Sequence, residues 1–365
     1  MKIGIMTHHW SRNNYGQFLQ HYALQVTLRK MRYTPFLINY VPKNTFSKRI
    51  KNCITHPLQM VKRIFSILVN MFFFRQAKQK RCNDFETFYK KYFALSAHHY
   101  GSIEDLRNNP PEADIYLTGS DQVWNPFGNM KTIAPFFLDF GSENVQRISY
   151  AASWGRTTLP ENEKTIITPL LKKFKAVTVR ETSGIELCHE CGCPHAEFAP
   201  DPTLLLDAAD YRAIMKCPQD TAKDEKYLLL YRLKNNDEYD YSKIFSFAHK
   251  KGLKVKYITG NGLIDFRQQC FPSIEEWLYM IDHAEYVVTN SFHGTVFAMI
   301  FKKQFAVIPL KGEVKEMNQR LDTLFDITGI TPRYLSDFSV LDTAYSADLD
   351  NIHHNAQQIL QKLLK

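Results

Sequence analysis

Residues 285–301 read EYVVTNSFHGTVFAMIF: a short apolar run, a polar loop and a second apolar run. The first run predicts a strand over 285–290, and the second predicts a helix from about 293 to 301. Pairs of short apolar runs and amphipathic stretches recur along the rest of the chain. This alternation is the βαβ pattern of parallel sheets, so we expect an α/β fold.

Working outward from this unit, the same pattern forms two series. We expect strands over 2–7, 36–41, 114–120, 147–153, 176–181 and 196–200 in the first series, with a helix over 17–31, and strands over 227–233, 254–260 and 305–310 in the second, with helices over 241–250 and 274–283. Two such series predict two Rossmann-like domains that face a cleft. The expected domains are 1–210, with a basic and apolar insert at about 43–92, and 220–335, followed by a C-terminal helix within 336–365.

Composition is that of an ordinary globular protein, with 365 residues, 44% hydrophobic residues and 46 Lys and Arg against 37 Asp and Glu. The basic excess lies in one segment, since Lys43 to Tyr92 holds 12 basic and two acidic residues. Inside it, the apolar run Ile64–Phe74 is too short to span a bilayer. We interpret residues 60–80 as a helix on an anionic membrane surface; the alternative is a helix packed on the core. No helix-turn-helix, zinc-finger or RNP signature supports nucleic-acid binding.

The chain shows no secretory signal, and its seven cysteines are an odd number. We therefore expect reduced thiols in a cytoplasmic protein, attached peripherally to the inner face of the membrane if residues 60–80 meet lipid. The cluster Cys188–His195 gathers cysteine and histidine, both possible soft ligands, within eight residues, but it lacks the paired spacing of zinc knuckles. We expect no metal there, and a helix end with free thiols instead.

Ligands of open α/β sheets lie beyond the carboxyl ends of the strands, which directs attention to Thr289–Thr295. Asn290 or Ser291 can cap the following helix, whose free N–H groups favour an anion. His293 in the first turn is a candidate acid or base, and Gly294 allows close approach of a ligand. The alternative is that His293 bonds a neighbouring loop. Thr295 completes this candidate binding set.

The loop before the first helix is a second candidate binding site. Asn14 and Gly16 lie at the turn into that helix, and Gln20 lies one turn further on. These side chains can face the same cleft, although a plain βα turn would have the same sequence.

Two further strand ends carry polar groups. Ser120 and Asp121 can hold a hydroxylated ligand or form a structural Asx turn, and Trp124 can offer its face to a sugar ring or fill the core. Arg180 can grip a phosphate or carboxylate, or pair internally. Arg320 is either a second cation of the cleft or a surface charge.

Asp201-Pro202 is interpreted as a turn that joins the domains. GxGxxG after the first strand, GxxxxGK[ST] and GxSxG are absent from the sequence, which disfavours NAD-type, P-loop and hydrolase chemistry.

Seven pieces of the chain resemble the polysaccharide pyruvyl transferase family in the family's order: NNYGQFLQHYAL (13–24), ADIYLTGSDQVWNP (113–126), RISYAASWG (147–155), AVTVRE (176–181), APDPTLLL (199–206), EWLYMIDHAEYVVTNSFHGTVFAMIF (276–301) and NQRLDTLF (318–325). The resemblance implies a fold like that of GT-B glycosyltransferases. It also implies transfer of pyruvate from phosphoenolpyruvate to a sugar of a cell-surface glycan precursor, such as an exopolysaccharide or capsule, as a cyclic ketal.

By the same resemblance, His293 is the catalytic acid/base and Arg180 binds phosphoenolpyruvate, which is the donor substrate; no other cofactor is implied. Some family members carry an Arg two residues before that His, where this chain has Ser291. A second cation is then expected from Arg320, Lys311 or Arg232.

Three functions remain open from the residues. The first is the pyruvyl transfer, in which Asp121 assists His293 and the acceptor is a glycan or lipid-linked sugar. The second is a GT-B-type glycosyltransferase that uses a nucleotide-sugar. The third is a non-catalytic assembly factor at the membrane surface.

Overall fold

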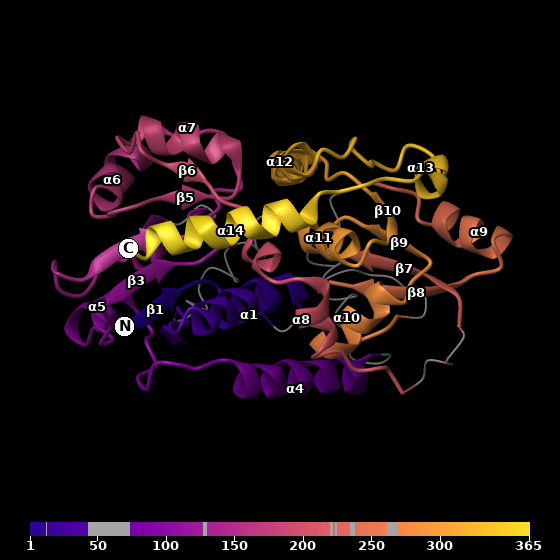
Figure 1. Ribbon diagram of the computed structural model, residues 1–365, viewed down its shortest axis with the longest axis horizontal. Coiled ribbons are helices and arrows are strands. Elements are labelled where there is room, and N and C mark those ends of the chain that lie inside the picture. Colours follow the sequence, from indigo (N-terminus) through magenta and orange to yellow (C-terminus); the bar gives the residue numbers. More distant parts are fainter. Residues whose placement is uncertain are drawn as a thin grey trace, which may run out of the picture.

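The computed structural model describes residues 1–11, 13–42, 74–126, 130–219, 222, 225–233, 238–260 and 269–365. Two parallel α/β sheets lie side by side along the long axis of the molecule, each flanked by helices (Figure 1). The predicted α/β class is therefore confirmed.

The first sheet has the strand order β2-β1-β3-β4, all parallel. Single bridges from Ile148 to Ala176 and from Ala152 to Val179 continue it into a two-stranded pair, β5 and β6. Beyond Ser149 the backbone pairs with its neighbours only through single bridges. The regular strands β4 and β5 are therefore shorter than the strands predicted from the apolar runs. The bounds are β1 Lys2–Met6, β2 Thr34–Leu37, β3 Ile115–Thr118, β4 Gln146–Ser149, β5 Thr178–Val179 and β6 Glu197–Phe198.

The second sheet has the order β10-β9-β7-β8, again all parallel. Its strands are β7 Tyr227–Arg232, β8 Lys254–Thr259, β9 Tyr286–Thr289 and β10 Gln304–Val307. Every strand of this sheet was predicted within a few residues; β7, β9 and β10 are mostly buried aliphatic and aromatic runs, whereas β8 buries only its second half.

Helices follow most strands, and several begin at a capping side chain that the sequence supplies. Asn14 accepts from the backbone of Gln17 at the start of α1, and Ser273 with Glu276 forms a capping box on α10. The helices are α1 Tyr15–Lys30, α4 Arg75–Tyr92, α5 Ile103–Asn108, α6 Glu161–Leu171, α7 Thr182–Glu190, α8 Ala208–Arg212, α9 Ser242–Lys250, α10 Ile274–Asp282, α11 Phe292–Ile300, α12 Gln319–Thr328, α13 Ser339–Asp342 and α14 Leu349–Leu363, with 3₁₀ turns η1 Met130–Thr132, η2 Ala134–Phe137, η3 Pro202–Leu205 and η4 Gly312–Asn318.

One apolar cluster joins the two halves of the molecule. Tyr15 and Phe18 of α1 belong to the same buried cluster as Trp277 of α10 and Phe297 of α11. The Tyr15 and Trp277 rings stack with their centroids 5.0 Å apart. Because α1 begins beyond the carboxyl end of β1, this contact fixes that end of the first sheet against the second sheet.

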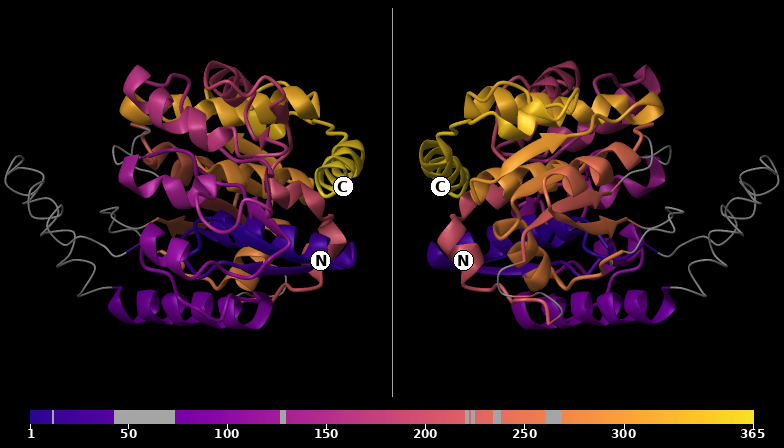
Figure 2. Two further views of the ribbon diagram at one scale, coloured as in Figure 1. Left: turned by 90° about the vertical axis from the view of Figure 1, so that its left-hand side faces the viewer. Right: turned by 90° about the vertical axis from the view of Figure 1, so that its right-hand side faces the viewer.

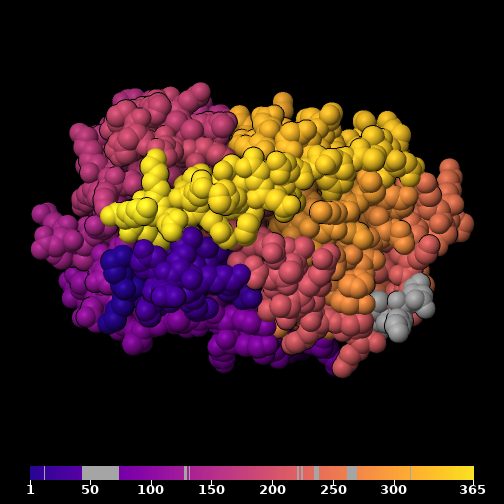
Figure 3. All heavy atoms as spheres, viewed as in Figure 1, coloured from indigo at the N-terminus to yellow at the C-terminus, as the bar shows by residue number. Residues whose placement is uncertain are grey.

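The last helix, α14, runs across both halves of the chain (Figure 1, Figure 3). It begins after the second half and packs its buried Ala356 and Leu360 into the cluster that contains Ile3 and Leu24. Its apolar stripe therefore ties the end of the chain back to the first sheet.

The basic insert is described only in part. Residues 43–73, which include nearly all of the apolar run and much of the segment 60–80, lie outside the described residues. The described part is α4, which lies along one edge of the molecule near α1 and α10 (Figure 1, Figure 2) and buries Phe85 and Phe88 in the core. Among the helices that the structure describes, none is long and apolar enough to cross a membrane.

Candidate active site

A pocket of about 350 Å³ opens where the carboxyl ends of both sheets meet. Its lining follows β1, β3, β7, β9 and β10, which is where ligands of open α/β sheets lie. The residues that line it are His8, Trp10, Asn14, Gln17, Asp121 and Gln122 from the first half and Leu233, Asn290, Ser291, Phe292, His293, Leu310 and Arg320 from the second. The structure thus brings together many of the strand-end residues that the sequence singled out.

His293 is held at the start of α11 by its neighbours. Ser291 is the N-cap and accepts from the backbone N–H of Gly294 at 3.3 Å. Asn290 accepts from the backbone of Leu233 at 2.7 Å, which ties the end of β9 to the end of β7. A Cβ on Gly294 would lie 2.6 Å from Oγ1 of Thr289, so a side chain is excluded there.

Gly16 forms the other wall around His293. A Cβ at this position would lie 2.1 Å from Cγ of His293, closer than nonbonded atoms can approach. Only glycine therefore lets the first turn of α1 press against the imidazole ring. This contact explains the glycine of the first loop better than ligand binding does.

Asp201 is the centre of charge behind the pocket, and it is not merely a linking turn, as the sequence suggested. Its Oδ2 lies 2.6 Å from Nη1 of Arg180 and 3.5 Å from Nε2 of His293. Its Oδ1 accepts two hydrogen bonds from Thr203. Burial alone would raise the pKa of this carboxyl, but the charges of His293 and Arg180 hold it well below its usual range.

Two guanidinium groups lie against one aromatic ring. The Cζ atoms of Arg180 and Arg320 are 4.9 and 5.7 Å from the centroid of Phe292. Burial and the like charge of Arg180 lower the pKa of Arg320 to about 10. Nε and Nη2 of Arg180 are buried and have no hydrogen-bond partner among the described residues. This paired cation site has donors to spare for an anion.

Asp121 closes the first-half side of the pocket with an unusual backbone, at φ 77°. Its Oδ2 accepts from Nε2 of Gln17 at 3.2 Å. Burial would raise the pKa of Asp121, but the charges of Arg180 and two histidines keep it below its usual range. The side chain is therefore a carboxylate at neutral pH, aimed into the pocket by a backbone that few residues adopt.

Trp124 does not offer a face to a sugar, because it is fully buried in the core of the first half. Its ring stacks on Phe137 and contacts Trp154, and its Nε1 donates to the carbonyl of Phe136. Trp10, which the sequence analysis did not single out, and Phe292 are aromatic residues that do line the pocket.

Four further candidates lie behind the pocket wall. Gln20, Ser120 and Thr295 are fully buried, and they bond to Gln17, Asp201 and Ser291 respectively. Arg180 is 2% exposed and does not line the pocket in this conformation. These residues support the side chains that line the pocket.

Of the three cations proposed to replace an Arg at position 291, Arg320 is the one that lines the pocket. Lys311 is exposed and lies 3.6 Å from Glu238, and Arg232 lies over the ring of Tyr241.

The cysteine cluster forms the end of α7 and the turn after it. Cys188, Cys191 and Cys193 are buried in an apolar cluster, and burial raises the pKa of Cys188. Within the part of the chain that the structure describes, no group of three His, Cys, Asp or Glu side chains is placed to hold a metal ion.

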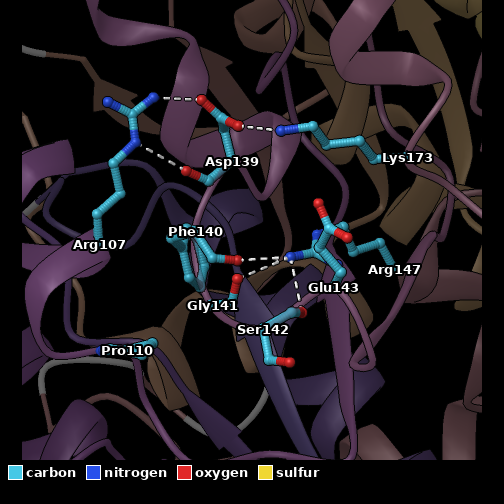
Figure 4. Close-up of a pocket in the computed structure, with 9 residues that line it drawn as sticks. All are labelled: Arg107, Pro110, Asp139, Phe140, Gly141, Ser142, Glu143, Arg147 and Lys173. Carbon is cyan, nitrogen blue, oxygen red and sulfur yellow. Dashed lines mark hydrogen bonds and ion pairs between the residues drawn. The ribbon is translucent and has the colours of Figure 1, made fainter.

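A second pocket, of about 570 Å³, lies at the amino-terminal end of the first sheet (Figure 4). Its Asp139 pairs with both Arg107 and Lys173, and Arg147 donates to the carbonyls of Phe140 and Ser142. Asp139 is thus paired with Arg107 and Lys173, and Arg147 is held by backbone carbonyls, so we interpret this pocket as structural.

The chain matches the family model described as polysaccharide pyruvyl transferase over residues 14–312. No curated protein matches it in sequence. Among solved structures it is similar to the UDP-GlcNAc 2-epimerase from Neisseria meningitidis bound to UDP-GlcNAc, with a TM-score of 0.51, 9% identity and coverage of 100% of this chain and 99% of that chain.

It is also similar to the UDP-GlcNAc 2-epimerase from Methanocaldococcus jannaschii, with a TM-score of 0.50, 10% identity and the same coverage of both chains. At such identities the likeness concerns the fold alone. The fold is two Rossmann-like domains that face a cleft, as in GT-B-like enzymes.

Proposed function

The chain belongs to the polysaccharide pyruvyl transferase family, and on this premise we propose that it transfers pyruvate from phosphoenolpyruvate to a sugar of a cell-surface glycan precursor as a cyclic ketal. The observation that carries this proposal is that Arg320 lines the pocket beside His293 and lies, with the buried Arg180 behind the pocket wall, against the ring of Phe292. The pair suits a small, highly charged anion, and the histidine suits the proton transfers that a ketal requires.

The donor would enter with its phosphate and carboxylate toward Arg320. Arg320 supplies the positive charge that an Arg at position 291 would give, since it lines the pocket. Burial and the like charge of Arg180 make the charge of Arg320 costly when no anion is bound. Free N–H groups at the start of α11 add to the attraction for an anion. Apart from the acceptor sugar, phosphoenolpyruvate is the only non-protein group that this proposal requires.

The reaction can be written with all protons placed. C3 of the enol takes a proton from His293, and an acceptor hydroxyl oxygen bonds to the cation-like C2. The bond from C2 to the phosphate oxygen then breaks, phosphate leaves, and a second hydroxyl of the same sugar closes the ketal. Of the two hydroxyl protons released, one replaces the proton given to C3 and the other leaves with phosphate.

The carboxylate of Asp201 lies 3.5 Å from Nε2 of His293, where it faces the imidazole ring from behind the pocket. Asp121, a carboxylate across the pocket, is placed to accept a hydrogen bond from an acceptor hydroxyl. Asp201 thus acts through His293, whereas Asp121 acts on the acceptor.

The acceptor side of the pocket is formed by Trp10, Asn14 and Gln17. An aromatic face and two amides are suited to a sugar ring and its hydroxyls. A lipid-linked sugar at the inner face of the membrane is the acceptor that we propose, and binding of the full chain to anionic liposomes tests the membrane part separately.

The function is tested by phosphate release from phosphoenolpyruvate with and without lipid-linked and p-nitrophenyl galactoside acceptors, read together with the mass of the product. We expect acceptor-dependent release and a product heavier by one pyruvate less one water. His293→Ala should lower turnover by about 10²–10⁴-fold with the fold intact, whereas His98→Ala, at an exposed position, should retain it. No release with any acceptor, together with thermal stabilisation by a nucleotide-sugar, would favour a glycosyltransferase instead.

A further inference from the structure

The pocket is lined by a second histidine, His8, which follows β1 by two residues. The strand end that carries it is fixed, because Oγ1 of the preceding Thr7 donates to the carbonyl of Ser120 at 2.7 Å. His8 thus reaches the pocket from the first sheet, whereas His293 reaches it from the second.

The ring of His8 is held by aromatic neighbours. It meets Trp10 edge-on at 4.9 Å between centroids and lies 4.5 Å from Phe136. Nε2 is buried and has no hydrogen-bond partner among the described residues. A buried nitrogen without a hydrogen-bond partner lowers the stability of the fold, so its presence needs an explanation. A hydrogen bond from a bound ligand or a water molecule is such an explanation.

Burial favours the neutral form of His8. Burial lowers the pKa of His8, and the opposing effects of Asp121 and the Gln122 backbone are smaller. The other titratable groups that line the pocket are His293 on α11 and Arg320 on α12. A neutral imidazole keeps a lone pair on one ring nitrogen, and Nε2, which has no partner among the described residues, is the atom placed to act as a base.

We propose that His8 is a second catalytic residue, the base that removes the proton from the first acceptor hydroxyl while that oxygen bonds to C2 of the donor. This role rests on the proposed function. It separates the two histidines by task, since His293, which faces Asp201, gives its proton to C3. His293 then takes the proton of the second hydroxyl and is restored, and the proton on His8 leaves with phosphate. Trp10, in edge contact with His8, holds the acceptor ring.

The test compares wild type, His8→Gln and His8→Ala in the full chain. We expect both variants to bind phosphoenolpyruvate in calorimetry within about twofold of wild type and to lose about 10²-fold or more in kcat. In wild type, kcat/KM for the acceptor should fall as the pH drops below about 6.5, and this acidic limb should be missing in His8→Gln. Added imidazole should restore part of the activity of His8→Ala, which a merely structural role would not allow. His98→Gln, at an exposed position, serves as the control with an unchanged profile.

The outcomes separate the two proposals. Wild-type turnover together with a His8→Gln variant that keeps its rate and its acidic limb overturns the role of His8 alone. If wild type makes no ketal with any acceptor, the proposed function falls and the role of His8 falls with it. If His8→Ala loses its fold, as judged by circular dichroism, His8→Gln decides the matter, because glutamine keeps most of the volume and a polar end.

Discussion

Asp201 shows how a single buried residue sets the charge of a site. It pairs with Arg180, faces His293 and receives both hydrogen bonds of Thr203, with no exposure to solvent. A buried carboxylate is costly unless such partners compensate it. The residue therefore couples the ionisation of the pocket to the stability of the fold.

Replacement of Asp201 by Asn is expected to destabilise the protein by about 3–5 kcal/mol at neutral pH, because Arg180 is left buried and unpaired. The pKa of Asp201 is depressed in the folded state, so its contribution is present above its unfolded value of about 3.9 and is lost as the pH falls below it. Urea unfolding of both proteins across this range should show their difference shrinking toward acid. A difference that stays constant with pH would contradict this assignment.

Gly16→Ala tests the contact with His293. We expect kcat to fall by about 10²-fold, because the new methyl group displaces the imidazole ring. In a His293→Gly background the side-chain atoms that the new methyl group would meet, Cβ of residue 293 included, are gone, and the same change should then cost clearly less stability than in the wild-type background. Thermal unfolding of the four proteins in this cycle provides the measurement. A destabilisation of equal size in both backgrounds would show that the two residues are not coupled.

The residues of the site differ in how well their positions could be predicted from the sequence. His293 and Asp121 follow apolar runs, and strand ends are readable, so both were predicted to face the cleft. Asp201 was not, because its partner Arg180 is joined to it by folding alone and no local pattern encodes the pair. The sequence left Trp124 open, since a tryptophan after a strand end is compatible with either a binding surface or the core, and the structure places it in the core.

Helices and strands also differ in how well the sequence predicts them. The unit 285–301 was predicted because its apolar runs have strand and helix lengths. The helix α4 was not predicted with these bounds, since its high charge masks the spacing of Phe85, Phe88 and Tyr89, the apolar side chains that it buries. Its apolar residues lie three and one apart, a helical stripe too narrow to stand out among basic neighbours.

The helix α12 and the turn η4 before it carry Arg320 to the pocket. Arg320→Ala is expected to weaken binding of phosphoenolpyruvate about tenfold to a hundredfold, the range for a lost hydrogen bond to a charged group. Lys311→Ala is the matched control, because that exposed lysine pairs with Glu238 outside the pocket and its loss should leave the Kd unchanged. Isothermal calorimetry with phosphoenolpyruvate compares the two. Equal weakening by both changes would mean that general attraction, not Arg320, holds the donor.

At the scale of the whole molecule, the two halves share their largest apolar cluster, so the pocket between them is fixed by packing. The chain also returns through α14 to the first sheet (Figure 3). Such a large buried junction makes the relative position of the sheets part of the folded state. The two domains could be foreseen from the order of strands and helices, but this junction could not, because aromatic residues that cross it look the same as those that fill either core.

This junction predicts that the halves unfold together. Tyr15 crosses it, stacking on Trp277 and donating to the carbonyl of Pro272, while Tyr116 is equally buried, donates to the carbonyl of Pro111 and lies within the first half. Wild type should show one calorimetric transition, with a van't Hoff enthalpy close to the calorimetric value. Tyr15→Ala and Tyr116→Ala should each cost about 3–5 kcal/mol, but only Tyr15→Ala should lower the ratio of the two enthalpies by uncoupling the halves. Two separate transitions in wild type would refute the junction as a cooperative contact, and a lowered ratio in Tyr116→Ala would show that any core lesion has this effect.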